Sequence, residues 1–262
     1  MNIINNIKFL KNYQKRFSYF INAIKKEPEL DEVIIQYLNE NLDQNEKRNE
    51  YLKDLLKDLM GTSLVEGLKI IDSLNKTIKV DGDICEFGVA QGKTSKLIAY
   101  FIKDSKKKLF LIDSFQGLPE PSNKDVLKDD IFDLGDIKKY KGKMSCPEGK
   151  VLNELRSINF NDDKLIVNKG FFNSESMTKM KLPNTVSFAY LDFDFYQPTL
   201  DGLNYLGSVL SIGGIIIVDD YDFFSTGVKT SVEEWFEINS KSYTKKIIKT
   251  KNASFAILEK IY

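Results

Sequence analysis

The chain has 262 residues, of which 42% are hydrophobic and 12% aromatic, so it contains enough apolar material for a buried core. Lys and Arg total 38, as do Asp and Glu, and this balance gives no overall field that would attract nucleic acid or a membrane. Histidine is absent, which excludes Ser–His triads, Cys–His pairs, ordinary zinc-protease sites and imidazole bases. The two cysteines, Cys85 and Cys146, do not support a disulfide framework. We expect a cytoplasmic protein without stable membrane insertion, because charged residues interrupt every apolar stretch.

The front of the chain, residues 1–78, predicts an all-helical extension. Residues 1–26 carry six positive charges and no acid, with apolar residues at roughly helical spacing. Such a basic helix either lies on a membrane surface or packs against the core or a second subunit, and we favour packing. Amphipathic helices follow from Leu30 to Met60, Gly61 ends them, and Thr62-Ser63 could cap the next helix. We expect this extension to act as a lid or to supply contacts in a homodimer or larger homo-oligomer.

Residues 79–262 predict a single α/β domain. Short apolar runs alternate with helices, which is typical of a parallel sheet covered on both faces. The expected strands are residues 84–87, 109–112, 164–167, 186–191 and 215–218, with helices over 94–102 and around 200–210. Residues 245–250 and 254–258 then predict an antiparallel closing hairpin. We therefore expect a Rossmann-like, mostly parallel seven-stranded sheet with an antiparallel end.

Residues 114–150 fit neither the helical nor the strand pattern. A long irregular segment after a strand is often a substrate-binding cap, and the other interpretation is a disordered surface loop.

The segment from Glu86 to Thr94, with Gly88 and Gly92, joins the first predicted strand to its helix. Glycines let the backbone approach a ligand closely, and the helix N-terminus offers N–H groups to a carboxylate or phosphate. Such a turn alone is also an ordinary tight connection. Asp113 ends the second strand, where an acid can accept hydrogen bonds from ribose hydroxyls. Together they predict a nucleoside ligand at the switch point of the sheet.

Four aspartates follow the fourth and fifth predicted strands: Asp192, Asp194, Asp219 and Asp220. Carboxylates crowded together repel one another, so either one holds a proton or a cation lies between them. Oxygen ligands without His or Cys suit a hard ion such as Mg²⁺.

These motifs, in this order, resemble the macrocin O-methyltransferase (TylF/MycF-like) family. The resemblance covers roughly residues 60–262, and its segments are Glu86–Gly92, Asp113–Pro121, Lys169–Phe172, Asp192–Thr199 and Gly213–Tyr221. It implies the class I methyltransferase fold, S-adenosylmethionine as methyl donor, a requirement for Mg²⁺, and an acceptor hydroxyl on a sugar or natural-product ring. Some relatives are credited with a histidine base in the cap region, which this chain lacks.

We also assign expected roles to individual residues. Asp192, Asp219 and Asp220 are the expected metal ligands, Asp194 is the expected general base, and Lys229 is a lesser candidate for that base. Thr62 has two equally good interpretations: it caps the next helix, or it contacts the methyl donor. The residues expected to contact the donor are Thr62, Glu86, Phe87, Gly88, Val89, Gly92, Thr94, Ser95, Asp113, Ser114, Phe115, Gly170, Phe171 and Asp192.

Two other functions remain open from the sequence. A metal-dependent glycosyltransferase could use Asp192-Phe-Asp194 to bind a metal–nucleotide, but this leaves the glycine turn, Asp113 and the closing hairpin unexplained. A nucleoside-binding protein without turnover is the third reading. The sequence does not identify the acceptor: a sugar of a polysaccharide or secondary metabolite is the best guess, and a phosphorylated or nucleotide-linked molecule stays open.

Overall fold

The computed structural model describes residues 28–42, 45–251 and 253–262, so the basic helix predicted over 1–26 lies outside the described residues. The described residues form two compact units: those up to Asp58 together with Ile131–Asp133, and those of Leu59–Asp130 together with Leu134–Tyr262. Among the helices of the described residues, none has the length and apolarity needed to cross a bilayer. Cys85 and Cys146 are both buried and free.

The first unit contains two described helices, α2 (Pro28–Asn41) and α3 (Glu46–Lys57), in the region where the sequence predicts amphipathic helices. Asn45 caps α3 by accepting a hydrogen bond from the Arg48 amide. An ion pair of 2.5 Å between Lys57 Nζ and Asp31 Oδ1 joins the two helices.

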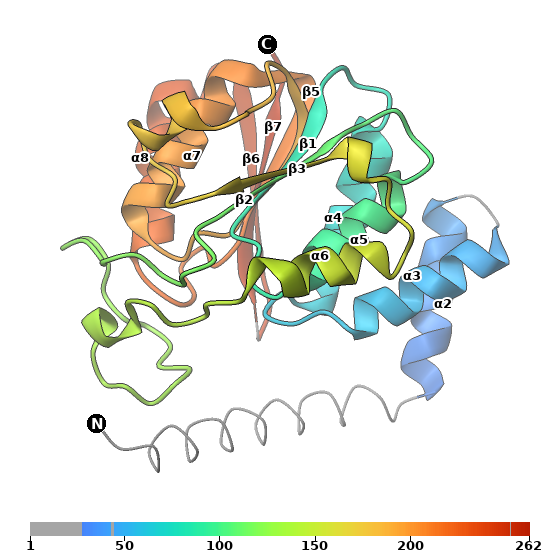
Figure 1. Ribbon diagram of the computed structural model, residues 1–262, viewed down its shortest axis with the longest axis horizontal. Coiled ribbons are helices and arrows are strands. Elements are labelled where there is room, and N and C mark those ends of the chain that lie inside the picture. Colours follow the sequence, from blue (N-terminus) through green and yellow to red (C-terminus); the bar gives the residue numbers. More distant parts are fainter. Residues whose placement is uncertain (1–27, 43–44, 252) are drawn as a thin grey trace. The chain divides into compact units, whose positions relative to one another are not determined.

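The second unit is built on a seven-stranded sheet of order β3-β2-β1-β4-β5-β7-β6 (Figure 1). Strands β1 to β5 pair in parallel, whereas β7 runs antiparallel to both β5 and β6. This confirms the predicted class I methyltransferase fold. The strands are β1 (Asp83–Phe87), β2 (Leu109–Asp113), β3 (Leu165–Lys169), β4 (Val186–Leu191), β5 (Leu210–Val218), β6 (Tyr243–Lys249) and β7 (Ser254–Lys260).

Helices cover both faces of this sheet, as its apolar central strands require. All six residues of β4 are buried, so neither of its faces contacts water. Helices α7 (Tyr196–Val209) and α8 (Gly227–Asn239) pack together on one face, and α4 (Leu64–Thr77) and α5 (Lys93–Ile102) on the other (Figure 1). Helix α6 (Glu148–Arg156) packs against α5, and short 3₁₀ turns span Ile137–Tyr140, Asp162–Lys164 and Ser176–Lys179.

The long segment after β2 is fastened to the carboxyl edge of the sheet. Backbone hydrogen bonds join Lys128 N to Phe224 O and Thr226 N to Val126 O, at 2.9 and 3.0 Å. The buried Asp125 carboxylate accepts the amides of Ser122 and Tyr196, both at 2.7 Å, and thereby ties this segment to the start of α7. The predicted cap region is thus held beside the loop that follows β5.

Candidate functional site: an acidic cluster beside a glycine turn

Three parallel strands end side by side at the carboxyl edge of the sheet. Phe87 at the end of β1 is paired with Leu191 of β4, which is paired with Val218 of β5. One more hydrogen bond follows each pairing, from Asp192 N to Phe87 O and from Asp219 N to Leu191 O, at 2.8 and 3.0 Å. The acidic residues therefore begin where the hydrogen-bonded pairing of the strands ends. This edge is the usual ligand-binding edge of an open α/β sheet.

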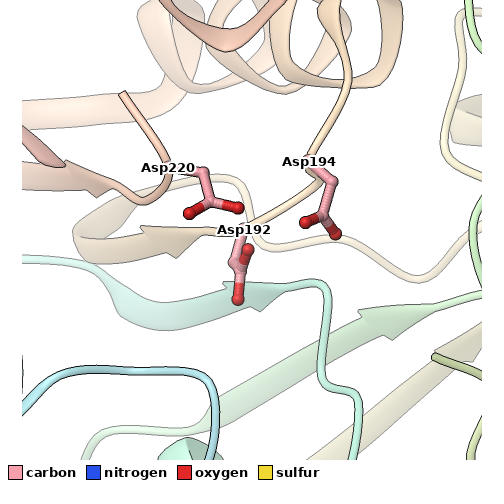
Figure 2. A group of neighbouring side chains, drawn as sticks. All are labelled: Asp192, Asp194 and Asp220. Carbon is pink, nitrogen blue, oxygen red and sulfur yellow. The ribbon is translucent and has the colours of Figure 1, made fainter. Parts of the chain in front are cut away.

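Asp192, Asp194 and Asp220 form one acidic cluster, in which a carboxylate oxygen of each lies within 4.8 Å of the others (Figure 2). Asp194 and Asp220 have φ angles of +60° and +55°, in the left-handed region that side chains other than Gly seldom adopt. A strand continuing past Leu191 is therefore not what brings Asp194 to Asp192. The chain turns sharply after each strand, and these turns direct the carboxylates toward one another.

The cluster differs in one member from the predicted set of ligands, which was Asp192, Asp219 and Asp220. Asp219 Oδ2 accepts a hydrogen bond of 2.8 Å from the Tyr190 hydroxyl, and Asp219 Oδ1 accepts one of 2.7 Å from the Asp220 amide. Asp194, the expected base, takes the third place in the cluster. Asp219 lies beside it and orients the turn that carries Asp220.

Burial first, and neighbouring charges second, destabilise the ionised forms of the acidic residues. Removal from bulk water is the largest cause that raises the pKa of Asp192 and Asp220, and the charge of Asp219 is the next. The same desolvation raises the pKa of Asp194 to about 7. It also raises the pKa of Asp219, against the opposing effect of the hydrogen bond from Tyr190.

The chemistry of this cluster fits a hard divalent cation. Within the described part of the chain, no ion pair joins Asp192, Asp194 or Asp220 to a lysine or arginine. The three residues are half-buried and not fully enclosed, so an ion can reach them. Oxygen atoms are their only donors, and this donor set favours Mg²⁺ over metals that prefer nitrogen or sulfur.

The glycine turn lies directly against the acidic cluster. Gly88 has φ +81°, and a Cβ atom at this position would lie 1.7 Å from the carbonyl oxygen of Asp192. No other residue fits there, because the turn after β1 and the turn after β4 share this space. Gly92 has φ +75° and precedes α5, whose N-terminus has no side-chain cap. The amides at that helix start point to the same edge of the sheet.

Asp113 at the end of β2 holds the glycine turn in place. Asp113 Oδ2 accepts the amides of Val89 and Ala90 at 2.6 and 3.2 Å, and Oδ1 accepts the Phe115 amide at 2.5 Å. The sequence predicted a role for this carboxylate in binding ribose. The structure adds a role in shaping the backbone of the turn.

Glu86 is a buried carboxyl group next to the turn. Neither of its oxygen atoms has a hydrogen-bond partner of ordinary geometry among the described residues, although the buried Ser95 hydroxyl lies near enough to stabilise its charged form. Burial raises the pKa of Glu86 from 4.5 to about 8; the Ser95 hydroxyl acts in the opposite direction, and the Asp113 charge adds to the increase. An unpaired buried carboxyl group is costly, and a cationic ligand group would satisfy it.

A chain of hydroxyl groups connects the start of α5 to the acidic residues. Thr62 Oγ1 lies 2.8 Å from Thr94 Oγ1 and 3.3 Å from the Tyr190 hydroxyl, which donates to Asp219. Ser63, not Thr62, is the residue that caps α4 by accepting the Glu66 amide. Thr62 is therefore free of the capping role that the sequence left open.

Two residues of this region were not identified from the sequence, Tyr190 and Glu66. Tyr190 is fully buried within the apolar run of β4, and its hydroxyl is the only polar side-chain signal in that run after Ser187. Glu66 follows Ser63 in the Ser-x-x-Glu pattern of a capping box, which predicts a side chain at the helix surface. Its carboxyl group is instead buried near Asp219, and burial and that charge raise its pKa.

The remaining predicted residues divide between the edge of the sheet and other surroundings. Ser114 donates to Gly117 O at 2.9 Å, and Gly170 N donates to Asp113 O at 2.9 Å, so both support the end of β2. Phe115 is buried with φ +54°, whereas Phe171 is 40% exposed and available to a ligand. Lys229 lies 3.6 Å from Asp222 and is not part of the acidic cluster.

Comparison with known proteins supports the class of protein that this fold and site indicate. The model of the macrocin-O-methyltransferase (TylF) family matches residues 34–252, and the chain belongs to that family.

The chain is similar to an 8-demethyl-8-(2,3-dimethoxy-alpha-L-rhamnosyl)-tetracenomycin-C 4'-O-methyltransferase of Streptomyces olivaceus, with 29% identity over 59% of this chain and 61% of that protein. It is also similar to the demethyldecarbamoylnovobiocin O-methyltransferase of Streptomyces niveus, with 26% identity over 64% of this chain and 66% of that protein. Both matches therefore span slightly less than two thirds of the relative. The solved structure of the O-methyltransferase NovP superimposes with a TM-score of 0.63 at 19% identity, covering 94% of this chain and 99% of that one, and so shares the fold.

Replacing Asp113 tests whether the glycine turn binds the methyl donor. Asp113→Ala should weaken binding of S-adenosylhomocysteine by about 1–3 kcal/mol, because charge-assisted hydrogen bonds to the turn and to ribose are lost. Titration calorimetry measures this change. Asp104→Ala, an equal change of charge at an exposed position before β2, should bind normally. Unchanged affinity in folded Asp113→Ala would rule out the role of Asp113.

Glu86 should make stability depend on pH. Between about pH 4.5 and 8 the folded protein keeps the Glu86 proton while the unfolded chain loses it, so the free energy of unfolding falls as pH rises. Glu86→Gln has no such proton, and its decline should be shallower by up to about 1.4 kcal/mol per pH unit. Urea unfolding across this range, with exposed Glu237→Gln as control, provides the measurement. Parallel declines in wild type and Glu86→Gln would show that Glu86 ionises freely.

Proposed function

We propose that this protein is an S-adenosylmethionine-dependent O-methyltransferase that methylates a hydroxyl of a sugar or related small molecule with the help of Mg²⁺. The observation that carries the proposal is the contact between the glycine turn and the acidic cluster at Gly88 and Asp192, in a member of the TylF family. The similar Streptomyces olivaceus protein is named as an O-methyltransferase of a rhamnosyl-bearing compound, which supports a sugar-bearing acceptor.

On the donor side, the residues of the turn supply binding and orientation. The S-adenosylmethionine sulfonium supplies the electrophilic methyl group. Asp113 accepts hydrogen bonds from ribose hydroxyls while it holds Val89 and Ala90 in position. Glu86 pairs with the donor's ammonium group, which gives its two unpartnered oxygen atoms a cation. Thr62 and Thr94, hydrogen bonded to each other, lie near the start of α5 to receive the donor carboxylate.

On the acceptor side, the carboxylates supply the charge that a hydroxyl nucleophile needs. Mg²⁺ bound there supplies a Lewis acid that lowers the pKa of the acceptor hydroxyl. Asp192 and Asp220 are ligands both in the predicted set and in the observed cluster. Asp194 and Asp219 are the two candidates for the third ligand position.

We assign the general base to Asp194 and the third ligand position to Asp219. Asp194 follows β4 in a strained turn whose carbonyl accepts the Ser225 hydroxyl at 2.8 Å, so its position is fixed from the loop after β5. Both oxygen atoms of Asp219 accept hydrogen bonds from the protein, yet a carboxylate has lone pairs left for a cation. The hydrogen bonds of Asp219 would hold it in place as a ligand.

The glycosyltransferase alternative rests only on Asp192-Phe-Asp194. It gives no role to the turn at Gly88, to the hydrogen bonds of Asp113 or to the antiparallel end of the sheet. Membership of the TylF family adds further weight against it.

The test of the proposed function is methyl transfer from radiolabelled S-adenosylmethionine to extracts and defined sugar acceptors. Label should move to a hydroxyl, transfer should cease in EDTA, and added Mg²⁺ should restore it, because oxygen ligands alone form the site. Calorimetry with S-adenosylhomocysteine and with nucleotide sugars distinguishes a methyltransferase from a glycosyltransferase. Full turnover in metal-stripped protein would remove Mg²⁺ from the proposal. Failure to bind S-adenosylhomocysteine would reject the methyltransferase function itself.

Asn substitutions separate the base from the metal ligands. Asp194→Asn should keep the affinities for Mg²⁺ and S-adenosylhomocysteine but lose roughly 10²–10⁴-fold in kcat, the usual contribution of a general base. Asp219→Asn should lose Mg²⁺ affinity. Titration calorimetry with Mg²⁺ and single-turnover kinetics give the two readouts. Loss of Mg²⁺ affinity in Asp194→Asn, with normal affinity in Asp219→Asn, would show that Asp194 is the third ligand and Asp219 is not.

A further inference from the structure

Three lysines gather around one aspartate beside the acidic cluster. Lys128 Nζ lies 2.5 Å from Asp222 Oδ1, whereas Lys229 Nζ and Lys249 Nζ lie 3.6 and 3.9 Å from Asp222 Oδ2. We call Lys128, Lys229 and Lys249 the lysine patch. All three side chains are exposed, with 37%, 47% and 67% of their surface in water, and Asp222 lies among them at 22%.

The lysine patch comes from three separate segments that meet at the carboxyl edge of the sheet. Lys128 belongs to the segment fastened to Phe224, and Lys229 lies in the first turn of α8, which has no acidic residue in that turn. Lys249 ends β6, which is parallel to β5 because β7 runs antiparallel to both. The ends of β5 and β6 therefore face the same way, and the patch lies on the side of the sheet that carries Asp220.

The charges of this patch do not cancel. Three ammonium groups face the single carboxylate of Asp222, and only Lys128 donates a hydrogen bond to it. The neighbouring Glu233 pairs with Lys245, which balances its charge, and the charge of Lys229 also acts on it. Including Asp129, whose charge acts on Asp220, the group remains positive. One lysine would be enough to neutralise Asp222.

The patch is separated from the acidic cluster by a short distance along the chain. Asp220 and Asp222 are two residues apart, so at most about 7 Å of backbone lies between them. That separation is comparable to the width of one sugar ring. A sugar whose hydroxyl lies at Asp220 would therefore place a substituent on its far side near Lys229 and Lys249.

We propose that the lysine patch binds the phosphate of a phosphorylated acceptor, so that this protein methylates a sugar phosphate or a nucleoside-diphosphate sugar. The inference rests on the proposed function and names the class of its substrate. Ammonium groups on flexible stems bind phosphate oxygens as point charges, and three of them suit a group of two or more negative charges. Asp222 keeps the lysines together in the absence of that group.

The test compares three probes in calorimetry with Mg²⁺ and S-adenosylhomocysteine present: UDP-glucose, glucose 1-phosphate and neutral methyl glucoside. The phosphorylated probes should bind more tightly than the glucoside, and Lys229→Gln/Lys249→Gln should weaken their binding by roughly tenfold or more. Their binding should also weaken with added salt, and less steeply in the double variant. Lys106→Gln/Lys241→Gln is the matched control, because both residues are exposed and precede β2 and β6 at the opposite edge of the sheet. This control should bind as wild type does.

The outcomes separate this inference from the proposed function. Equal binding of all three probes, or equal affinity of the double variant and wild type for the phosphorylated probes, would overturn the role of the patch. Equal affinity of the double variant and wild type would also indicate that Mg²⁺, and not the lysines, binds the phosphate. S-adenosylhomocysteine binding in the same samples reports on the methyltransferase function separately, since the patch is not part of the donor site.

Discussion

The constraint on which this site depends is the cost of holding several carboxylates close together and away from bulk water. Parallel pairing of β4 with β5 brings their ends together, and each strand is followed by aspartates. Hydrophobic burial of the central strands overcomes the electrostatic cost of this arrangement. The cost is visible in the raised pKa of every member of the cluster and in the left-handed turns at Asp194 and Asp220. Strain and like charge concentrated at one edge are features of a site that binds a cation.

The glycine turn, which forms the second half of the site, is held at the same edge of the sheet by packing and hydrogen bonds and not by charge. Gly88 is in contact with the backbone of Asp192, so the position of the turn after β1 follows from that of the turn after β4. Asp113 then fixes the other side of the glycine turn by accepting its amides. The hydroxyls of Thr62 and Tyr190 form a further connection to Asp219. The two halves of the site are thus packed as one unit rather than assembled from independent loops.

The sequence was sufficient for the fold because the apolar runs are short, regular and bounded by turn residues. The closing hairpin could be recognised from its two runs around Lys251-Asn252-Ala253, and the ligand edge from Gly88, Gly92 and Asp113. What could not be predicted depends on side-chain direction beyond the strand ends. Alternation applies only within a strand, and β4 stops at Leu191, so the place of Asp194 was set by a turn that the pattern does not describe. Glu66 and Tyr190 were missed because a capping box and an apolar strand are the ordinary settings of such residues.

The outer strand β6 has a consequence for how the molecule meets its neighbours. It ends the sheet, so one side of its backbone has no partner strand in the described chain and could pair with another molecule. Its sequence places the exposed Lys246 and Lys249 along this boundary. Two such strands approaching each other would bring like charges together and would have to remove ammonium groups from water. The lysines therefore protect the end of the sheet against edge-to-edge aggregation.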